Sequence, residues 1–242
     1  MVAIFKPATD VYSFYEQIMS FYPICLDLEG KTCVVVGGGR VAERKVLGLL
    51  SCAAQVSVIS PELTEELLRL HNEGIITWIN REYRPGDLEQ SFLVIAATDD
   101  VDTQKQVFEE AAALDLLLNV ADVPQRCNFI LPATVRQGDL TISISTAGKS
   151  PALAGKLRME LEKRFGVEYR VLVDILGAIR PLILASGLSQ ADNEKLFKQL
   201  LHDDMAGWIK ASNWSSLENH FERVLGDRVG ENWLQQIRAI YL

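Results

Sequence analysis

The chain has 242 residues, of which 48% are hydrophobic and 23% are charged, the balance of a folded globular protein rather than of a disordered one. Its formal net charge of −8 argues against a nucleic-acid partner, because phosphate binding needs a positive field. No stretch approaches the ~20 apolar residues of a membrane span, and residues 1–22 lack the pattern of a signal peptide. We therefore expect a soluble protein with no membrane partner, made of one large domain and one smaller domain.

The four cysteines form no C-x-x-C pair, and the three histidines lie far from them in sequence. This spacing is a poor match to a zinc site, so we expect no metal site in the chain. Cys33 lies in an apolar, strand-like run and is expected to be a buried, reduced thiol. Reduced cysteines are typical of a cytoplasmic protein.

Residues 1–20 are an N-terminal extension with no clear role. From there to Ala121, short runs rich in β-branched residues alternate with helical patterns, which predicts a parallel sheet of the Rossmann-like α/β class. A first helix is expected at 41–50, and later helical faces contain Leu67 and Val107. The expected strands are 32–36, 55–60, 75–79, 92–97 and 116–121.

The alternation ends after Asp122. Two strand-like arms, 129–136 and 140–145, are joined by Gln137-Gly138-Asp139, a sequence typical of a hairpin. A helix should then begin with Ser150 as its cap and Pro151 in its first position, and end near Gly166. Everything from 168 onward reads as helical, with Pro181 expected to kink or split the first of these helices.

The strongest local signal is the segment VVVGGGRVAERK at 34–45. Gly37, Gly39 and Ala42 fit the G-x-G-x-x-G/A fingerprint of dinucleotide-binding domains, placed after a strand and before a helix. Gly37 permits the tight turn, Gly39 lets the backbone approach a pyrophosphate, and Ala42 lets the helix pack closely. The alternative is a glycine turn that serves only helix–sheet packing.

The end of the second strand bears on which dinucleotide is bound. The acidic residue that usually holds the ribose hydroxyls is replaced by Ser60-Pro61-Glu62, in which Glu62 comes slightly late. No Arg or Lys occurs between Gln55 and Glu66, although a 2′-phosphate would need one. The sequence therefore favours NAD over NADP.

Two strand ends carry further candidates. Asp122 directly follows the apolar run 116–121, so it should lie where open α/β sheets bind ligands. A partly desolvated carboxylate there can serve as an acid or base, but an Asp before Val-Pro is also a common turn residue. Thr98 ends the fourth strand and could face the cofactor. Asp99 and Asp100 are at least as well explained as helix caps.

Taken together, these motifs resemble the precorrin-2 dehydrogenase family, which includes the N-terminal part of sirohaem synthases. The resemblance covers about 22–165, and the helical remainder matches only in general character. It is carried by five segments in order: YPICLDLEGK (22–31), VVGGGRVAERK (35–45), VIAATDD (94–100), NVADVPQRCNFILPA (119–133) and STAGKSPALAGKLR (145–158).

The resemblance implies NAD-dependent oxidation of precorrin-2 to sirohydrochlorin in sirohaem biosynthesis, a branch of porphyrin and tetrapyrrole metabolism. It implies an NAD-binding Rossmann-like domain (21–133), a dimerisation segment (134–166) and a C-terminal helical domain (167–242), assembled as a homodimer. Some relatives also insert Fe²⁺ into sirohydrochlorin, a ferrochelatase activity. Fe²⁺ would then be a substrate.

The resemblance also implies roles for single residues. NAD contacts would come from Arg40 and Val41 in the glycine loop and from Pro61 and Glu62, and the catalytic residue would be Asp122. Related trifunctional enzymes have a serine where this chain has Thr146, which leaves open whether Thr146 accepts a phosphate.

The substrate's acetate and propionate groups need cationic and N–H partners, and 149–170 forms a positive island on an acidic protein. We expect these partners to be Lys149, Ser150, Lys156 and, in the Asp122 segment, Arg126. A solvated amphipathic helix is the alternative, above all for Lys163 and Arg164 and less so for Lys149. Two other functions stay open: an NAD-dependent dehydrogenase of another small substrate, and a dinucleotide-sensing module without catalysis.

Overall fold

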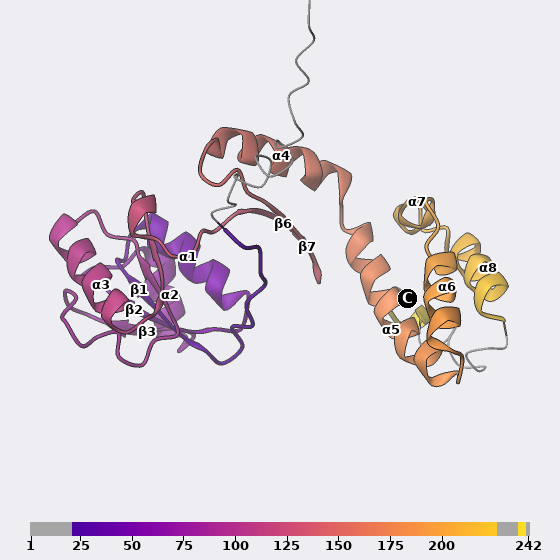
Figure 1. The fold of residues 1–242 in the computed structure, drawn as a ribbon, viewed down its shortest axis with the longest axis horizontal. Helices are drawn as coiled ribbons and strands as arrows, with labels where there is room; N and C mark the ends of the chain where they lie inside the picture. The colour runs from indigo at the N-terminus through magenta and orange to yellow at the C-terminus, as the bar shows by residue number, and fades with distance from the viewer. Residues whose placement is uncertain (1–20, 227–236, 241–242) are drawn as a thin grey trace, which may run out of the picture. The chain divides into compact units, whose positions relative to one another are not determined.

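A computed structural model describes residues 21–226 and 237–240, so the expected extension at 1–20 lies outside the described residues. The chain divides into two compact units, Met1–Leu131 and Pro132–Leu242. Each unit has its own hydrophobic core, and Figure 1 labels most of the elements of both.

The first unit is built on a five-stranded sheet in the order β3-β2-β1-β4-β5, in which every neighbouring pair is parallel. This confirms the Rossmann-like class. β3 is shorter than expected, because the Ile75 amide donates to the carbonyl of Leu70 at 2.9 Å and closes the preceding helix instead of extending the strand. The strands are β1 (Thr32–Val36), β2 (Gln55–Ile59), β3 (Thr77–Ile79), β4 (Leu93–Ala96) and β5 (Leu117–Val120).

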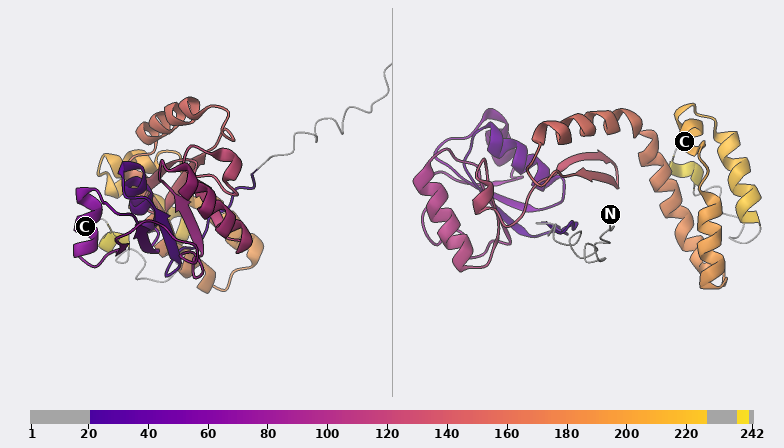
Figure 2. Two further views of the ribbon diagram at one scale, coloured as in Figure 1. Left: turned by 90° about the vertical axis from the view of Figure 1, so that its left-hand side faces the viewer. Right: turned by 45° about the horizontal axis from the view of Figure 1, so that its top comes forward.

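Helices cover both faces of this sheet, as Figure 2 shows. Because side chains alternate along a strand, Cys33 and Val35 of β1 pack with α1 and α2, whereas Val34 and Val36 pack with α3. The Cys33 thiol is fully buried, as the sequence indicated, and burial raises its pKa to about 11, with a further contribution from Cys52. The helices are α1 (Arg40–Leu50), α2 (Glu65–Asn72) and α3 (Val101–Ala113).

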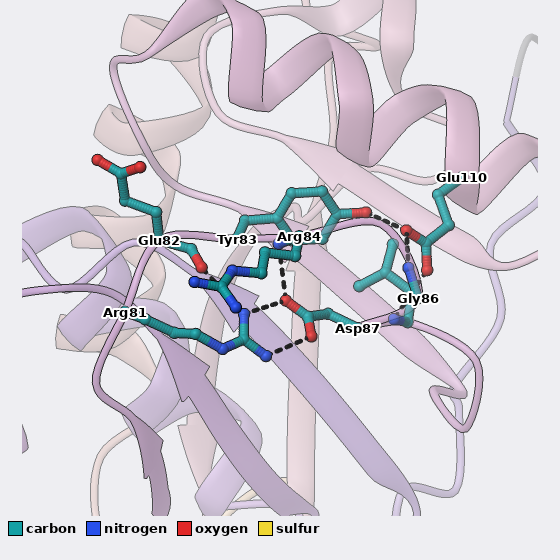
Figure 3. Close-up of polar contacts among 8 residues, drawn as sticks. Arg81, Glu82, Tyr83, Arg84, Gly86, Asp87 and Glu110 are labelled. Carbon is teal, nitrogen blue, oxygen red and sulfur yellow. Dashed lines mark hydrogen bonds and ion pairs between the residues drawn. The ribbon is translucent and has the colours of Figure 1, made fainter.

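The connection between β3 and β4 is fastened by two carboxylates, shown in Figure 3. Glu110 of α3 accepts hydrogen bonds from the Tyr83 hydroxyl and from the amides of Gly86 and Leu88, both at 2.9 Å. Asp87 accepts two bonds from the Arg81 guanidinium, each at 2.7 Å. Burial, followed by the bond to Glu110, raises the pKa of Tyr83. The Glu110 contacts tie this long irregular segment to α3, and the Arg81–Asp87 pair holds the segment together internally.

The second unit begins with an antiparallel hairpin and a long helix. β6 (Ala133–Gln137) pairs with β7 (Leu140–Ile144), and Gly138 makes the turn with φ +58°. The expected hairpin is confirmed, but its first arm starts at Ala133, because Phe129 packs against the core of the first unit. α4 (Pro151–Arg164) is capped by Ser150, whose hydroxyl accepts from the Leu153 amide at 3.3 Å.

After α4, the described residues of the second unit are mostly helical and share one core. α5 carries Ile175, Ile179 and Ile183, all fully buried against side chains of the later helices. Pro181 lies on the exposed side of α5, and the helix continues to Ala185, so the expected split is absent. Packing of the isoleucine face offsets the hydrogen bond that proline removes. The helices are α5 (Glu168–Ala185), α6 (Gln190–Leu200), α7 (Met205–Lys210) and α8 (Trp214–Leu225).

Candidate functional site

The glycine loop leaves β1 in a conformation that only glycine accepts at its first position. Gly37 has φ +117°, and its amide donates to the carbonyl of Ile59 at 2.9 Å. A β-carbon on Gly37 would lie 2.3 Å from the carbonyl oxygen of Ala97, which follows β4. The loop therefore passes directly over the point between β1 and β4 where the strand order reverses, which is the usual ligand crevice of such sheets.

Gly39 stands at the other end of the loop, as the N-terminal cap of α1. No described side chain makes a capping hydrogen bond there, and a β-carbon on Gly39 would meet nothing within 4 Å. The first-turn amides of α1 are thus left for an external anion, in front of open space. Arg40 and Val41 open the helix beside this space and are exposed. The cradle fits the pyrophosphate of a dinucleotide.

The turn after β2 interlocks with the glycine loop. A β-carbon on Gly38 would lie 1.9 Å from the carbonyl oxygen of Glu62 and 2.8 Å from the hydroxyl of Ser60. The Gly38 carbonyl in turn accepts from the Thr64 amide at 3.0 Å. Glu62 and Pro61 are exposed beside this contact. The fingerprint treats Gly38 as a variable position, so sequence reasoning missed it, although a third consecutive glycine was the available signal.

Thr98 lies where β4 ends and is half-buried next to the glycine loop. Its hydroxyl accepts from the Asp100 amide at 3.2 Å, and its carbonyl accepts from the Gln104 side chain at 2.7 Å. Asp100 caps α3 by accepting from the Thr103 amide at 2.6 Å, which confirms the cap interpretation for this residue. The hydrogen bonds from Thr103 also lower the pKa of Asp100.

Asp122 follows β5 by two residues, at the same edge of the sheet as the glycine loop. The Ala121 amide donates to the carbonyl of Ala96 at 2.8 Å, which joins the ends of β5 and β4. Asp122 has φ +60°, a left-handed conformation that is uncommon outside glycine and often marks functional sites. Its side chain is exposed, so the expectation of a partly desolvated carboxylate is wrong for this chain.

The turn that carries Asp122 is held by the thiol of Cys127. The sulfur lies 3.2 Å from the Val120 amide, 3.3 Å from the Val120 carbonyl and 3.4 Å from the Val123 carbonyl. The Asn128 side chain reinforces the arrangement, accepting from the Leu118 amide at 2.7 Å. Both residues bond to the outer side of β5, the edge strand, and so fix where the chain reverses.

Lys45 of α1 is a further charged group near this turn. It is half-buried, and burial lowers the pKa of its ammonium. The charge of Arg44 lowers this pKa further, whereas Asp122 and Cys127 act in the opposite direction. Lys45 thus interacts electrostatically with the Asp122 turn. Sequence reasoning missed it, although Lys45 follows the buried Ala42 by three residues on the helix after the glycine loop.

The residues expected to bind substrate carboxylates are split between the two units. Arg126 ends a short 3₁₀ turn after Asp122 and is half-buried. Lys149 and Lys156 are exposed in the second unit, and the Lys156 ammonium lies 3.9 Å from a Glu160 carboxylate oxygen. Carboxylates of α4 therefore offset part of the basic island. Ser150 is committed to capping α4, and its own amide donates to the Thr146 hydroxyl at 3.0 Å.

Known protein families and a solved structure match this chain over the regions just described. An NAD(P)-binding family matches residues 24–133, and a family described as the central part of sirohaem biosynthesis proteins matches 137–164. A solved structure described as SirC, precorrin-2 dehydrogenase, superposes with a TM-score of 0.70 at 27% identity, covering 90% of this chain and 100% of that one. The chain is thus similar to a solved precorrin-2 dehydrogenase over most of its length, and its two parts match an NAD(P)-binding family and a sirohaem biosynthesis family.

Curated siroheme synthases are similar to this chain over much of its length. Siroheme synthase 3 of Aeromonas hydrophila is 35% identical over 201 residues, which are 83% of this chain and 43% of that protein. Siroheme synthase of Nitrosococcus oceani is 43% identical over 144 residues, covering 60% of this chain and 31% of that protein. The chain thus spans less than half the length of these relatives.

In the first unit, the carboxyl edge of the sheet brings together most of the residues singled out from the sequence. They are Gly37, Gly39, Arg40, Val41, Pro61, Glu62, Thr98, Asp122 and Arg126. Among residues 21–226 and 237–240, no group of three or more His, Cys, Asp or Glu is arranged to hold a metal ion. In the same part of the chain, no helix has both the length and the apolar character needed to cross a membrane.

Proposed function

We propose that the chain is an NAD-dependent precorrin-2 dehydrogenase, which oxidises precorrin-2 to sirohydrochlorin. The observation that carries the proposal is the edge of the parallel sheet, where an open dinucleotide cradle and the exposed Asp122 carboxylate occur together. The solved relative described as a precorrin-2 dehydrogenase, which this chain covers over its whole length, supports the choice of substrate.

Bound NAD⁺ supplies the acceptor for a hydride, and a proton must leave the substrate separately. The residues of this chain bind NAD⁺, orient precorrin-2 and take up its proton. The first-turn amides of α1 hold the pyrophosphate, with Arg40 beside them, and the turn at Pro61 and Glu62 meets the ribose hydroxyls. The absence of Arg and Lys between Gln55 and Glu66 favours NAD over NADP, since a 2′-phosphate would meet the Glu62 carboxylate without a nearby cation from that segment.

Asp122 takes the proton in this proposal. Its left-handed backbone and the Cys127 contacts fix the turn that carries this exposed carboxylate at the sheet edge. Lys45 is a half-buried cation on α1 whose pKa is lowered by burial and raised, to a smaller extent, by the charge of Asp122. Arg126 follows four residues later, and its guanidinium suits a carboxylate of the ring by two parallel hydrogen bonds.

Lys149, at the start of α4, and Lys156 are proposed to bind further acetate or propionate groups of precorrin-2. Lys149 is exposed, and Gly148 before it has φ +80°, which places the two residues in a tight turn ahead of the helix. The N-terminus of α4 adds a partial positive charge to that of the lysine.

The same carboxylate could serve iron insertion, with Fe²⁺ and sirohydrochlorin as substrates. Chelation needs a base for the two pyrrole N–H protons and only transient contact with the metal. An exposed Asp122 meets the first need. We include this ferrochelatase step in the proposal as a second activity of one site.

We also propose a homodimer formed through the hairpin and α4. A two-stranded sheet is marginally stable by itself, and β6 and β7 pair only with each other among the described strands. α4 leaves Leu153 and Met159 about half exposed, at 48% and 51%. Sedimentation velocity on the full chain tests this directly: a monomer at micromolar concentration would contradict it.

Turnover of precorrin-2 tests the main proposal. Purified protein is mixed with precorrin-2 and NAD⁺, and NADH formation is followed together with the spectrum of sirohydrochlorin. NADP⁺ is the matched control and should give much slower turnover. Fe²⁺ is added in a second stage to test chelation. Failure to form NADH from precorrin-2, in protein that binds NAD⁺, would overturn the proposed substrate.

A further inference from the structure

Trp78 makes a contact with the cofactor edge of the sheet that the proposed mechanism does not use. It is the only tryptophan in residues 1–131 and lies in β3, opposite Val58 of β2. Its indole N–H donates to the carbonyl of Ser60 at 2.8 Å. The indole is half-buried, and the His71 ring packs against it edge-on, with ring centres 5.6 Å apart. One side chain of β3 thus holds the turn that follows β2.

This turn is where the adenosine half of a dinucleotide meets a Rossmann-like sheet, because the ribose hydroxyls bind at the end of the second strand. Ser60 is 8% exposed and is held from two sides by β3, since its amide donates to the Ile79 carbonyl at 3.3 Å. Its hydroxyl lies against Gly38, as the 2.8 Å contact with an ideal β-carbon shows. A shift of Ser60 would therefore move both the ribose end and the glycine loop.

We propose that Trp78 is a positioning residue for NAD, which sets the affinity of the adenosine half through its hydrogen bond to Ser60. The inference rests on dinucleotide binding at the glycine loop, which belongs to the proposed function. In this proposal, Trp78 affects NAD binding through Ser60 and Glu62 and does not contact the reacting atoms. It also places a fluorescent side chain one hydrogen bond away from the cofactor turn.

Trp78→Phe tests this, because phenylalanine keeps a ring against His71 but removes the N–H. Calorimetric titration of the full chain should show NAD⁺ and ADP-ribose binding weakened by about 3–10-fold, the range for loss of one hydrogen bond. Nicotinamide mononucleotide, which lacks the adenosine half, should bind as in the wild type. Trp208→Phe, in the second unit, is the matched control and should leave all three affinities unchanged.

Three results would overturn the inference. The first is a Trp78→Phe protein that binds ADP-ribose as tightly as the wild type does. The second is equal weakening of ADP-ribose and nicotinamide mononucleotide, which would indicate general loosening of the domain. The third is a wild type that binds no NAD⁺, which would remove the proposed cofactor site as well. Unchanged binding in the variant alone leaves that site intact.

Tryptophan emission provides a second measurement that does not need the variant to fold. In wild-type protein and in Trp208→Phe, ADP-ribose should change the emission to the same extent, because Trp78 reports on the turn. Nicotinamide mononucleotide should not change it. Emission that ADP-ribose leaves unaltered, in protein shown by calorimetry to bind it, would count against a link between Trp78 and the cofactor turn.

Discussion

The carbonyl oxygen of Glu62 lies 1.9 Å from the place where a β-carbon on Gly38 would stand. The turn after β2 and the loop after β1 therefore fit together only because position 38 has no side chain. Both segments belong to the proposed cofactor site, so a change at Gly38 disturbs two parts of it at once. The overlap involves backbone, which cannot swing aside as a flexible side chain can.

Gly38→Ala should consequently weaken NAD⁺ binding by at least ~10-fold, or about 1.4 kcal/mol, and lower the melting temperature. Gly48→Ala is the matched control, because Gly48 lies inside α1 and a β-carbon there meets nothing within 4 Å. Alanine in a helix interior is favoured over glycine by roughly 0.5–1 kcal/mol, so this control should be neutral or stabilising. Calorimetry and thermal unfolding of both variants measure the contrast. Equal NAD⁺ affinity in the two variants would show that the fit between these two turns does not matter for NAD⁺ binding.

Gly39→Asp tests the pyrophosphate cradle separately. The space in front of Gly39 is open, so the variant should fold, but its carboxylate would stand where the phosphates bind. Charge repulsion and bulk should lower NAD⁺ affinity by at least ~10-fold. Gly39→Ala adds bulk without charge and should have a smaller effect. An unchanged NAD⁺ titration in a folded Gly39→Asp protein would rule out this loop as the dinucleotide site.

Glu110 gives a prediction about stability alone. Its carboxylate accepts from the Tyr83 hydroxyl and from two backbone amides, as Figure 3 shows, and Gln in its place would turn an N–H₂ group toward donors. We expect Glu110→Gln to reduce the free energy of unfolding by roughly 2–3 kcal/mol, the range for hydrogen bonds to a charged group. Glu109→Gln is the control, since Glu109 is exposed and its carboxylate lies 3.8 Å from the Lys105 ammonium, so the loss should stay below ~0.5 kcal/mol. Denaturant unfolding of both variants measures the difference. Similar losses of unfolding free energy would show that the hydrogen bonds of Glu110 contribute little to stability.

Lys149→Glu addresses the substrate side. The new charge should repel the carboxylates of precorrin-2, so the apparent KM for precorrin-2 should rise several-fold, while the KM for NAD⁺ changes little. Because Lys149 is exposed, added salt should shrink the effect. Steady-state kinetics at two ionic strengths provide the test. A parallel rise in both KM values would indicate a folding defect rather than a substrate contact.

The sheet and the glycine cradle were predictable because their signals are local. A buried parallel strand is predicted by an apolar run such as Val34–Val36, and Gly39 and Ala42 predict the helix that follows it. The third strand was predicted too long because Ile75 is apolar, yet its amide completes the end of α2. Hydropathy alone cannot distinguish those two uses of the same residue.

What the sequence could not show are the contacts between segments far apart in the chain. The bond from Trp78 to Ser60, the overlap of Gly38 with Glu62 and the electrostatic effect of Asp122 on Lys45 depend on which strands become neighbours. The continuity of α5 through Pro181 has a similar origin, because buried isoleucines on one face outweigh a local helix breaker. In each case tertiary packing decides what the local pattern leaves open.

Asp122→Asn is the variant that tests the chemistry most directly. Asparagine has nearly the same shape and, like aspartate, is one of the few residues that accept the left-handed backbone seen at φ +60°, so folding and NAD⁺ affinity should be preserved. The amide cannot accept a proton as the carboxylate does. Loss of a general base lowers a rate by about 10²–10⁴-fold, or about 3–5 kcal/mol of barrier, and we expect the kcat of dehydrogenation to fall within that range, with a parallel loss of any chelation. A fall nearer ~10-fold would instead mean that water takes the proton and that Asp122 orients the ring. Single-turnover formation of NADH at saturating NAD⁺ separates these cases, and wild-type rates in Asp122→Asn would contradict both roles.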